Sequence, residues 1–431
     1  MPLRSRPFDA ITEADVRDLI ARQVREGPTL DYKQALDFSE SGRLDFLGDV
    51  TAMANGAGGT LLYGAAEGEG EDRGLIVDVR SLALAPDETD LRVANLLRDG
   101  VEERIAGIRH GTVPLAAGGY AYVVRVPASP LAPHMVTLPS RRPRFYRRGN
   151  VSNEPMNVQQ IKEVAARGDA AAARAAALVV ARTDAVRAHE ARRREAVRVR
   201  ESTAADTAGL TGASGAPGGL ALVHVVSLFP PRGGVDFADD AVYAPFVARP
   251  PNGSQRVVGY GSPRERFGLD GLSREYGEVG SGRGGYAYDA RQYTLLLRAG
   301  GLECAERELF VDARYRGGAR RAFRVWDAER LLLDALEEAR VLTEAGVLTL
   351  PLAVSLQVLD VEGAALVPEE GSGSSVGPDA PDAVVEPVVV ASWGPEADAA
   401  ARRLCDALWQ GWGIRRSRHF LPDGTLRPPA R

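Results

Sequence analysis

Two acidic residues and a lysine near the start of the chain have the spacing of a site for phosphate chemistry. Glu26, Asp31 and Lys33 lie close together, and Glu67 could add a third carboxylate. Three carboxylates can hold a hard divalent cation such as Mg²⁺, which prefers oxygen ligands. The metal then activates water and offsets charge on the transition state, while an ammonium assists at the phosphate. An acid-x-lysine triplet also occurs on ordinary surface strands, which is the alternative interpretation.

A run of arginines interleaved with aromatic residues at 141–148 is the second candidate. Its five arginines have no acid among them and flank Phe145 and Tyr146. Arginines bind phosphate oxygens and aromatic rings stack on bases, so the run predicts a nucleic-acid contact surface. A charged edge strand would have the same composition. The residues expected to contact nucleic acid are Arg141, Arg142, Arg144, Tyr146, Arg147 and Arg148.

Composition excludes several other kinds of site. Two cysteines, Cys304 and Cys405, are too few for a disulfide framework or a thiolate zinc site. The five histidines never come at metal-ligand spacing, so no zinc is expected. The net charge of −5 argues against a protein that coats nucleic acid over its whole surface, but it allows a local basic groove. Only Lys33 and Lys162 among the 53 basic residues are lysines.

The elements around these residues predict how they are positioned. Thr12 caps a helix that runs to about Arg25, and residues 29–33 then alternate as a strand. This alternation places Asp31 and Lys33 on the same face of that strand. A turn that contains Gly-Pro separates the two elements.

A glycine-rich turn follows the second predicted helix, residues 43–55, and leads into an apolar strand at 60–63. Because the turn follows a helix, no helix N-terminus is available to attract an anion, and a P-loop is excluded. Further strands are expected at 119–126, 134–138 and 145–147, with a helix beginning near residue 157. The mixture predicts an α+β fold with a mixed, mostly antiparallel sheet and flanking helices.

The length of 431 residues predicts two or three domains. We expect a first domain at 1–165, then a basic Ala/Arg-rich connecting helix and flexible linker at 166–219. A second α+β domain of unknown role is expected at 220–431, with a hairpin around Gly300-Gly301 and a disordered acidic loop at 361–386. No run of about 18 apolar residues and no signal peptide are visible, so a cytoplasmic protein is expected.

Four segments, taken in order, resemble the Schlafen AlbA-type domain family. They are residues 30–33 (LDYK), 51–64 (TAMANGAGGTLLYG), 126–134 (VPASPLAPH) and 145–150 (FYRRGN). The resemblance spans about residues 10–165, and its most specific part is the Ala-Asn-x-x-Gly-Gly segment.

The resemblance implies nucleic-acid binding and a metal-dependent endonuclease acting on tRNA-like RNA or on single strands. By motif position, Mg²⁺ or Mn²⁺ would be held by Glu26, Asp31 and Glu67, with Lys33 at the scissile phosphate. Asp31 stands where the family usually has glutamate, and Glu67 where aspartate is usual, so the oxygens shift by about a methylene.

The resemblance also bears on assembly and biological setting. A homodimer, paired through the Ala/Arg-rich helix, would recreate the two-lobed groove of animal Schlafen cores, and the family context suggests phage defence. The alternative function is a non-catalytic DNA-binding regulator, in which the C-terminal domain is a sensor or a partner-binding module.

Overall fold

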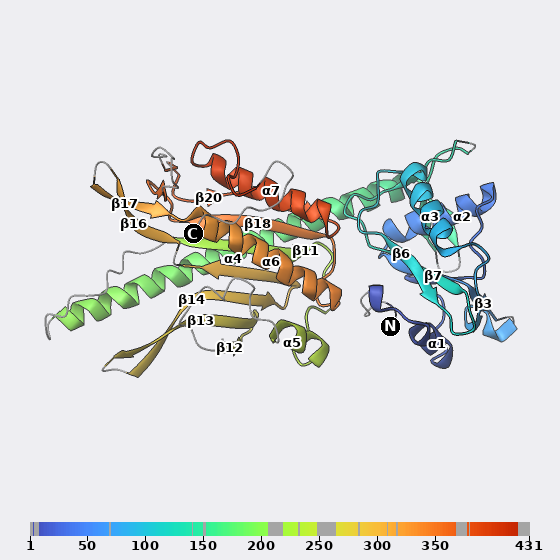
Figure 1. Ribbon diagram of the computed structural model, residues 1–431, viewed down its shortest axis with the longest axis horizontal. Helices are drawn as coiled ribbons and strands as arrows, with labels where there is room; N and C mark the ends of the chain where they lie inside the picture. The colour runs from blue at the N-terminus through green and yellow to red at the C-terminus, as the bar shows by residue number, and fades with distance from the viewer. Residues whose placement is uncertain are drawn as a thin grey trace. The chain divides into compact units, whose positions relative to one another are not determined.

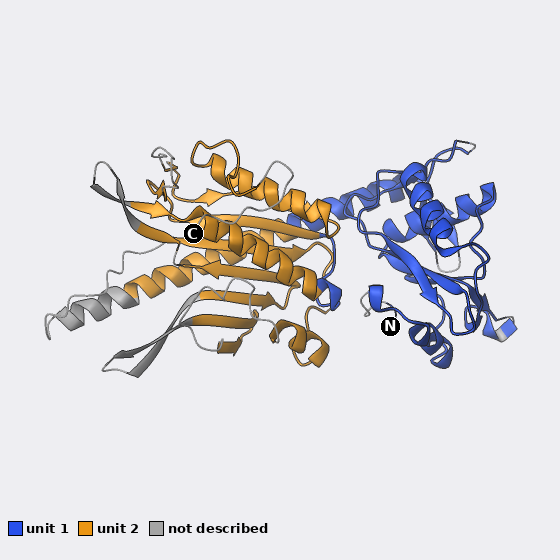
Figure 2. Cartoon of the chain, in the orientation of Figure 1, with its two compact units in different colours: residues 1–173, 343–351 blue, residues 174–342, 352–431 orange. Residues whose placement is uncertain are grey.

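The chain forms two compact units of mixed helix and sheet. The computed structural model describes residues 3, 8–68, 70–139, 141–149, 152–205, 219–231, 233–247, 264–282, 285–307, 309–315, 318–367, 377–378 and 380–420. Unit 1 comprises Met1–Ala173 and Thr343–Pro351, and unit 2 comprises Arg174–Leu342 and Leu352–Arg431 (Figure 2). Both units contain helices and mostly antiparallel sheets, which confirms the predicted α+β class.

Unit 1 contains two four-stranded sheets and a short hairpin. The first sheet has the order β1-β2-β7-β6, with β1 parallel to β2 and the other pairs antiparallel. The second sheet is antiparallel with the order β10-β9-β8-β5, and β3 pairs with β4. The strands are β1 (Leu30–Lys33), β2 (Gly59–Tyr63), β3 (Ala65–Glu67), β4 (Ile76–Val79), β5 (Val101–Glu102), β6 (Arg109–Pro114), β7 (Tyr120–Val126), β8 (Met135–Val136), β9 (Arg144–Arg148) and β10 (Asn153–Pro155).

The helices of unit 1 begin where the sequence supplies capping groups. Thr12 and Asp15 form a capping box at the start of α1 (Glu13–Ala21), as predicted. The Ser39 hydroxyl accepts from the Gly42 amide, so α2 (Glu40–Ala54) begins before the predicted residue 43. A third helix, α3 (Pro86–Gly100), was not predicted from the sequence. Short 3₁₀ turns lie at Phe8–Ala10 and Gly70–Asp72.

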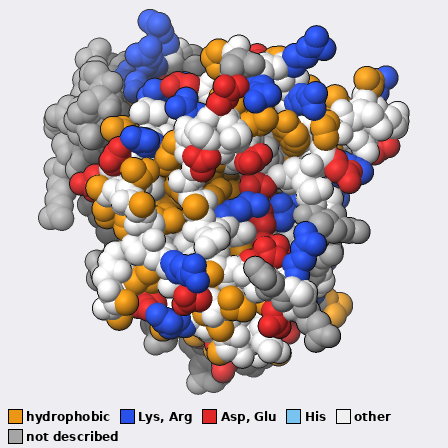
Figure 3. All heavy atoms as spheres, turned by 90° about the vertical axis from the view of Figure 1, so that its right-hand side faces the viewer, with side chains coloured by type: hydrophobic (Ala, Val, Ile, Leu, Met, Phe, Trp, Pro, Cys, Tyr) orange, Lys and Arg blue, Asp and Glu red, His pale blue; other side chains and the backbone are white. Residues whose placement is uncertain are grey.

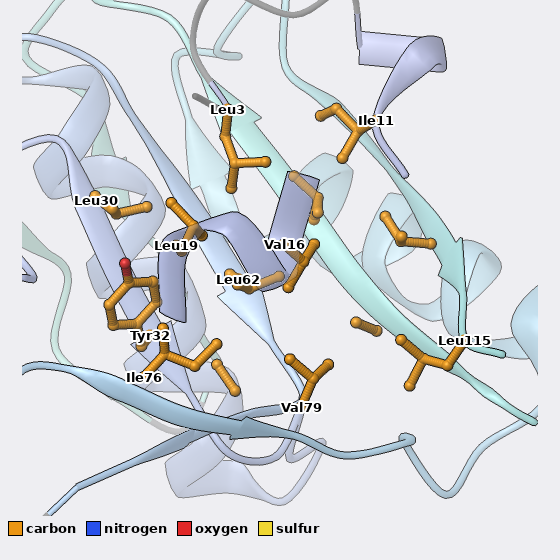
Figure 4. Packing of buried hydrophobic residues seen from close by; sticks show 14 residues of the cluster. Leu3, Ile11, Val16, Leu19, Leu30, Tyr32, Leu62, Ile76, Val79 and Leu115 are labelled. Atoms are coloured by element: carbon orange, nitrogen blue, oxygen red, sulfur yellow. The ribbon is translucent and has the colours of Figure 1, made fainter. Parts of the chain in front are cut away.

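Helices cover both faces of the β1-β2-β7-β6 sheet. Strand alternation directs Leu62 to one face, where it packs with α1 residues such as Leu19 (Figure 4). Leu61 and Tyr63 point to the other face and pack with α2 residues such as Phe46. β1 therefore lies at the edge of a sheet that is buried on both sides, with its neighbours fixed by two separate cores.

Unit 2 is built on an eight-stranded sheet of order β12-β13-β14-β15-β11-β18-β20, with β21 also paired to β18. All eight residues of β11 and all eight of β18 are buried, so helices cover both faces of the sheet. In Figure 1, α6 and α7 lie in front of it and α4 passes behind. A smaller sheet has the order β16-β17-β19.

The elements of unit 2 confirm the predicted hairpin, in which β14 and β15 meet around Gly300. The strands are β11 (Leu220–Ser227), β12 (Arg264–Phe267), β13 (Gly271–Gly282), β14 (Gly285–Leu297), β15 (Gly301–Glu306), β16 (Phe310–Tyr315), β17 (Gly318–Phe323), β18 (Leu352–Leu359), β19 (Ala365–Leu366), β20 (Ala383–Val384) and β21 (Val388–Val390). The helices are α5 (Asp240–Val247), α6 (Val325–Glu344) and α7 (Pro395–Gln410).

The predicted Ala/Arg-rich helix is α4 (Val158–Ala205), and much of it packs within unit 2. Val186 contacts the core around Leu222, and the Thr183 hydroxyl donates to Gln357. Arg182 and Arg194 pair with acids of the same unit rather than facing solvent alone. Pairing of two copies through this helix stays a prediction. Of the helix and linker expected together at 166–219, residues 166–205 are helical and residues 206–218 lie outside the described residues.

The prediction of disorder at 361–386 does not hold for the described ends of that segment. β19 and β20 lie within it, and Val361 and Ala364 are fully buried. Apolar residues at the two ends of an acidic stretch supply enough burial to order them. Residues 368–376 and 379 lie outside the described residues.

Candidate functional site

A groove of about 850 Å³ in unit 1 contains most of the predicted site residues. It lies between β1, α2, and the β9–β10 hairpin. Six acids line it against four basic residues, so its lining is net negative. The predicted site residues that line it are Glu26, Asp31, Lys33, Glu67, Tyr146 and Arg148. Figure 3 shows one face of the molecule, on which basic (blue) and acidic (red) side chains alternate without forming one basic patch.

The Glu26 and Asp31 carboxyl groups are hydrogen-bonded to each other at one side of the groove. Glu26 also accepts from the Tyr32 amide at 2.6 Å. Burial and then the contact with Asp31 raise the pKa of Glu26 to about 7. Burial acts in the same direction on Asp31, but the hydrogen bonds from Glu26 and Arg148 hold the pKa of Asp31 below its ordinary value. The proton shared by the pair therefore resides mainly on Glu26.

Two cations bridge Asp31 to a further acid, Asp49. The Lys33 ammonium lies 3.0 Å from Asp31 and 3.5 Å from Asp49. The Arg148 guanidinium lies 3.0 Å from Asp31 and 3.4 Å from Asp49. The Asn153 amide donates to Asp49 at 2.5 Å. The cluster of Asp31, Asp49, Lys33 and Arg148, which we call the charge cluster, thus satisfies most of its own charge internally.

Asp49 and Asn153 were missed by the sequence analysis. Asp49 is buried on α2 among apolar neighbours such as Phe46 and Val50, and burial raises its pKa to about 6. Asp49 lies three residues after Phe46 and next to Val50, at helix positions that face the core. An acidic residue at such a position is the feature by which the sequence could have identified Asp49 as a site residue. No pattern marks Asn153, because its role depends on the β9–β10 pairing.

The three predicted metal ligands do not form a metal-binding set in this arrangement. Glu67 accepts from the Gly74 amide at 2.7 Å, and Asp31 is committed to Lys33 and Arg148. Within the described part of the chain, no group of three His, Cys, Asp or Glu residues is arranged to hold a metal ion. The donor set as folded therefore does not fit Mg²⁺ or Mn²⁺.

The predicted arginines divide into two groups. Arg148 was expected to contact nucleic acid, but its side chain is only 9% exposed and lies in the charge cluster. Arg142 and Arg144 are exposed and form no ion pair with a described residue. Arg141 and Arg147 are also exposed and pair with Glu40 and Glu154.

Strand alternation places Arg147 and Arg148 on opposite sides of β9. Arg148 and Tyr146 are on the side of β9 that faces α2, where Tyr146 packs in the core and its backbone carbonyl is held by Asn55. Arg147 points the other way, to solvent. Four of the five arginines are thus exposed and do not line the groove, and two of these, Arg142 and Arg144, form no ion pair with a described residue.

The Ala-Asn-x-x-Gly-Gly segment joins the parts of this site. The buried Asn55 amide donates to the carbonyls of His134 and Tyr146, and its oxygen accepts from the His134 amide at 2.6 Å. Gly58 has a φ of +70°, and a Cβ there would come within 2.6 Å of the Ala128 backbone. Asn55 therefore fixes β9, and with it Arg148, against the end of α2.

Residues 26–157 match the family model described as Schlafen, AlbA_2. This confirms the predicted resemblance for that part of the chain and supports nucleic-acid binding there. No curated protein matches the chain.

One similar solved structure is the solution NMR structure of the N-terminal domain of a putative ATP-dependent DNA helicase RecG-related protein from Nitrosomonas europaea. It is 22% identical over 33% of this chain and 92% of that chain, with a TM-score of 0.23. A TM-score this low carries no argument. Among the helices that the structure describes, none has the length and hydropathy needed to cross a membrane.

Proposed function

We propose that the Schlafen AlbA_2 region, residues 26–157, binds nucleic acid through the arginines around β9, beside the groove. The observation that carries this proposal is the exposure of Arg142 and Arg144, neither of which is neutralised by a described acid. Unpaired surface arginines release counterions when they bind phosphates, which supplies most of the affinity for nucleic acid.

The charges around the groove favour binding of nucleic acid at its rim over binding in its interior. Phosphates are repelled by the net negative lining of the groove and attracted by the exposed arginines outside it. We infer that the sugar–phosphate backbone of the bound nucleic acid runs along the exposed arginines outside the groove.

The test is binding of labelled tRNA, single-stranded DNA and duplex DNA at several salt concentrations. Replacing Arg142 and Arg144 together by alanine should weaken binding. It should also reduce the steepness of the plot of log binding constant against log salt concentration by about 1 to 2. The matched control is Arg80→Ala, which removes an exposed arginine of the same unit that is paired with Asp78. Equal binding by the double variant and the control would contradict the proposal.

Metal-dependent cleavage of RNA is the second candidate function. It is favoured by the presence of Glu26, Asp31 and Lys33 in one groove, with Asp31 and Lys33 only 3.0 Å apart. It is placed second because the carboxylates, as folded, do not fit a metal ion. A nuclease role in phage defence rests on this second candidate.

Incubation of the same nucleic acids with Mg²⁺, with Mn²⁺ and with EDTA separates the two functions. Metal-dependent cleavage that Asp31→Ala abolishes, with binding retained, would establish the nuclease and overturn our order of preference. Binding without cleavage under every condition is the expected result. Binding by wild type but not by the double arginine variant would then assign the contact surface.

A further inference from the structure

A second cavity in unit 1, of about 260 Å³, lies outside the groove and has a different character. α3, β5, the following loop and the start of β6 form its walls. Its floor is apolar and includes Leu97, Val101, Ile105 and Ile108. Leu97, Ile105 and Ile108 pack against the core but are only partly buried. Covering this remaining apolar surface with a ligand would be favourable.

The polar residues that line the cavity are all basic or neutral. They are Arg98, Arg104 and His110, and no acid takes part in the lining. Arg98 is held by its neighbour Asp99 at 2.8 and 3.0 Å. Arg104 is exposed and forms no ion pair with a described residue, although Asp99 is close enough to interact with it electrostatically. The cavity therefore combines an apolar floor with an available guanidinium.

His110 is oriented by a partly buried chain of hydrogen bonds. The Tyr122 hydroxyl donates to Asp90 at 2.6 Å, so it accepts from His110 Nδ1 at 2.7 Å. This places the proton of the neutral ring on Nδ1 and leaves Nε2, which forms no hydrogen bond to a described residue. A protonated ring would present a second N–H at that position.

We propose that this cavity binds a small organic anion that has one carboxylate and a compact apolar body. The apolar body covers the floor around Leu97, and the carboxylate accepts from Arg104 and lies beside His110. Arginine suits this role because its planar N–H groups match the two oxygens of a carboxylate. The volume lies just below the range of about 300–1,000 Å³ usual for drug-sized ligands, so only a compact molecule fits.

The test uses the full chain and sodium benzoate, with benzamide as a neutral molecule of nearly the same shape. Saturation-transfer NMR titration should show saturable benzoate binding and at least about tenfold weaker benzamide binding. Arg104→Ala should weaken benzoate binding about tenfold, as expected for the loss of one charge-assisted hydrogen bond. Arg109→Ala is the matched control, because Arg109 is exposed, pairs with Asp9 and does not line the cavity.

Leu97→Trp should fill the cavity and abolish binding, with far-UV circular dichroism to establish that the variant is folded. Arg104→Ala alters an exposed side chain and tests the proposal even if the tryptophan variant does not fold. No saturable binding of benzoate, equal binding of benzamide, or unchanged binding by a folded Leu97→Trp variant would each overturn the proposal. Inorganic phosphate binding as tightly as benzoate would also overturn it, since phosphate cannot use the apolar floor.

Discussion

Replacing Arg148 by alanine should destabilise unit 1 because it removes one of the two cations that neutralise a pair of buried carboxylates. The Asp31 and Asp49 side chains are 3% and 6% exposed, and Arg148 contacts both. Removing one partner of a buried ion pair typically costs about 3–5 kcal/mol. Lys33 still contacts both acids, so we expect a loss just below this range, about 2–3 kcal/mol of unfolding free energy.

The neighbouring arginine supplies the matched control. Arg147 lies on the same strand, points to solvent and pairs with the half-exposed Glu154. Exposed pairs contribute about 0–1 kcal/mol, so Arg147→Ala should change stability little. Arg148→Met keeps much of the buried aliphatic stem of the arginine but removes its charge. If the charge and not the packing stabilises unit 1, Arg148→Met should lower the unfolding free energy almost as much as Arg148→Ala.

Hydrogen exchange measured on peptides of unit 1 is the appropriate assay. All four tryptophans, at 326, 393, 409 and 412, lie in unit 2, so fluorescence-detected urea unfolding reports on unit 2 and serves as an internal reference. Peptides from β1 and α2 should exchange faster in Arg148→Ala while the fluorescence transition stays in place. If Arg148→Ala and Arg147→Ala agree within about 0.5 kcal/mol, the charge cluster does not stabilise unit 1 and the reasoning is refuted.

Three further substitutions test other parts of the structure. Burial raises the pKa of Glu306 to about 7 in the folded protein, so wild type loses stability as the pH rises from the pKa of an unfolded glutamate toward 7. Glu306→Gln should therefore stabilise unit 2 at pH 8 but not at pH 4. The gain measured by urea unfolding should be at most about 3 kcal/mol. Asn55→Ala leaves one amide and two carbonyls without their partner and should destabilise unit 1 by about 2–4 kcal/mol by hydrogen exchange. Gly58→Ala should cost more than about 2 kcal/mol in the same assay, since the backbone is left-handed there and the added Cβ would clash.

Each of these has a control within the chain. For Glu306, the comparison is Glu303→Gln on the same strand, which should destabilise unit 2 at pH 7 because His224 and Arg182 hold the pKa of Glu303 at about 2 against the effect of burial. Asn95→Ala, at a half-buried position of α3, should have little effect beside Asn55→Ala. Gly118 also has a positive φ but has open space around it, so Gly118→Ala should cost less than Gly58→Ala. If a control variant had the effect on stability that is expected of its test variant, the explanation given for that test variant would be contradicted.

The sequence was most informative where local patterns decide the structure. The capping box at Thr12, the alternation that places Asp31 beside Lys33 and the turn at Gly300 are all local, and the structure confirms them. α3 was missed although it has local helix signals, namely Pro86 and two acids in its first turn and an amphipathic pattern of apolar residues. Only a capping side chain is missing at its start, at Ala85.

The candidate site could be predicted only in part because its residues meet through tertiary structure. Glu26, Asp31 and Lys33 are near in sequence and lie together in the groove. The role of Arg148 could not be read from an arginine run, since only the pairing of β9 shows which arginines turn inward. Glu67 lines the same groove, but its carboxylate is positioned by a hydrogen bond from the Gly74 amide. That contact could not be predicted from the sequence.

The scarcity of lysine makes the charge cluster a natural target for amine labelling. The chain has two lysine side chains, and Lys33 is the one in the groove, 36% exposed. Burial lowers the pKa of Lys33, but Asp49 and Asp31 outweigh it and raise that pKa above the ordinary value. Because acylating reagents attack only the neutral amine, Lys33 should react more slowly than the exposed Lys162. The ratio of the two adducts in one mass spectrum therefore reports whether the acids still hold Lys33, without any engineered probe.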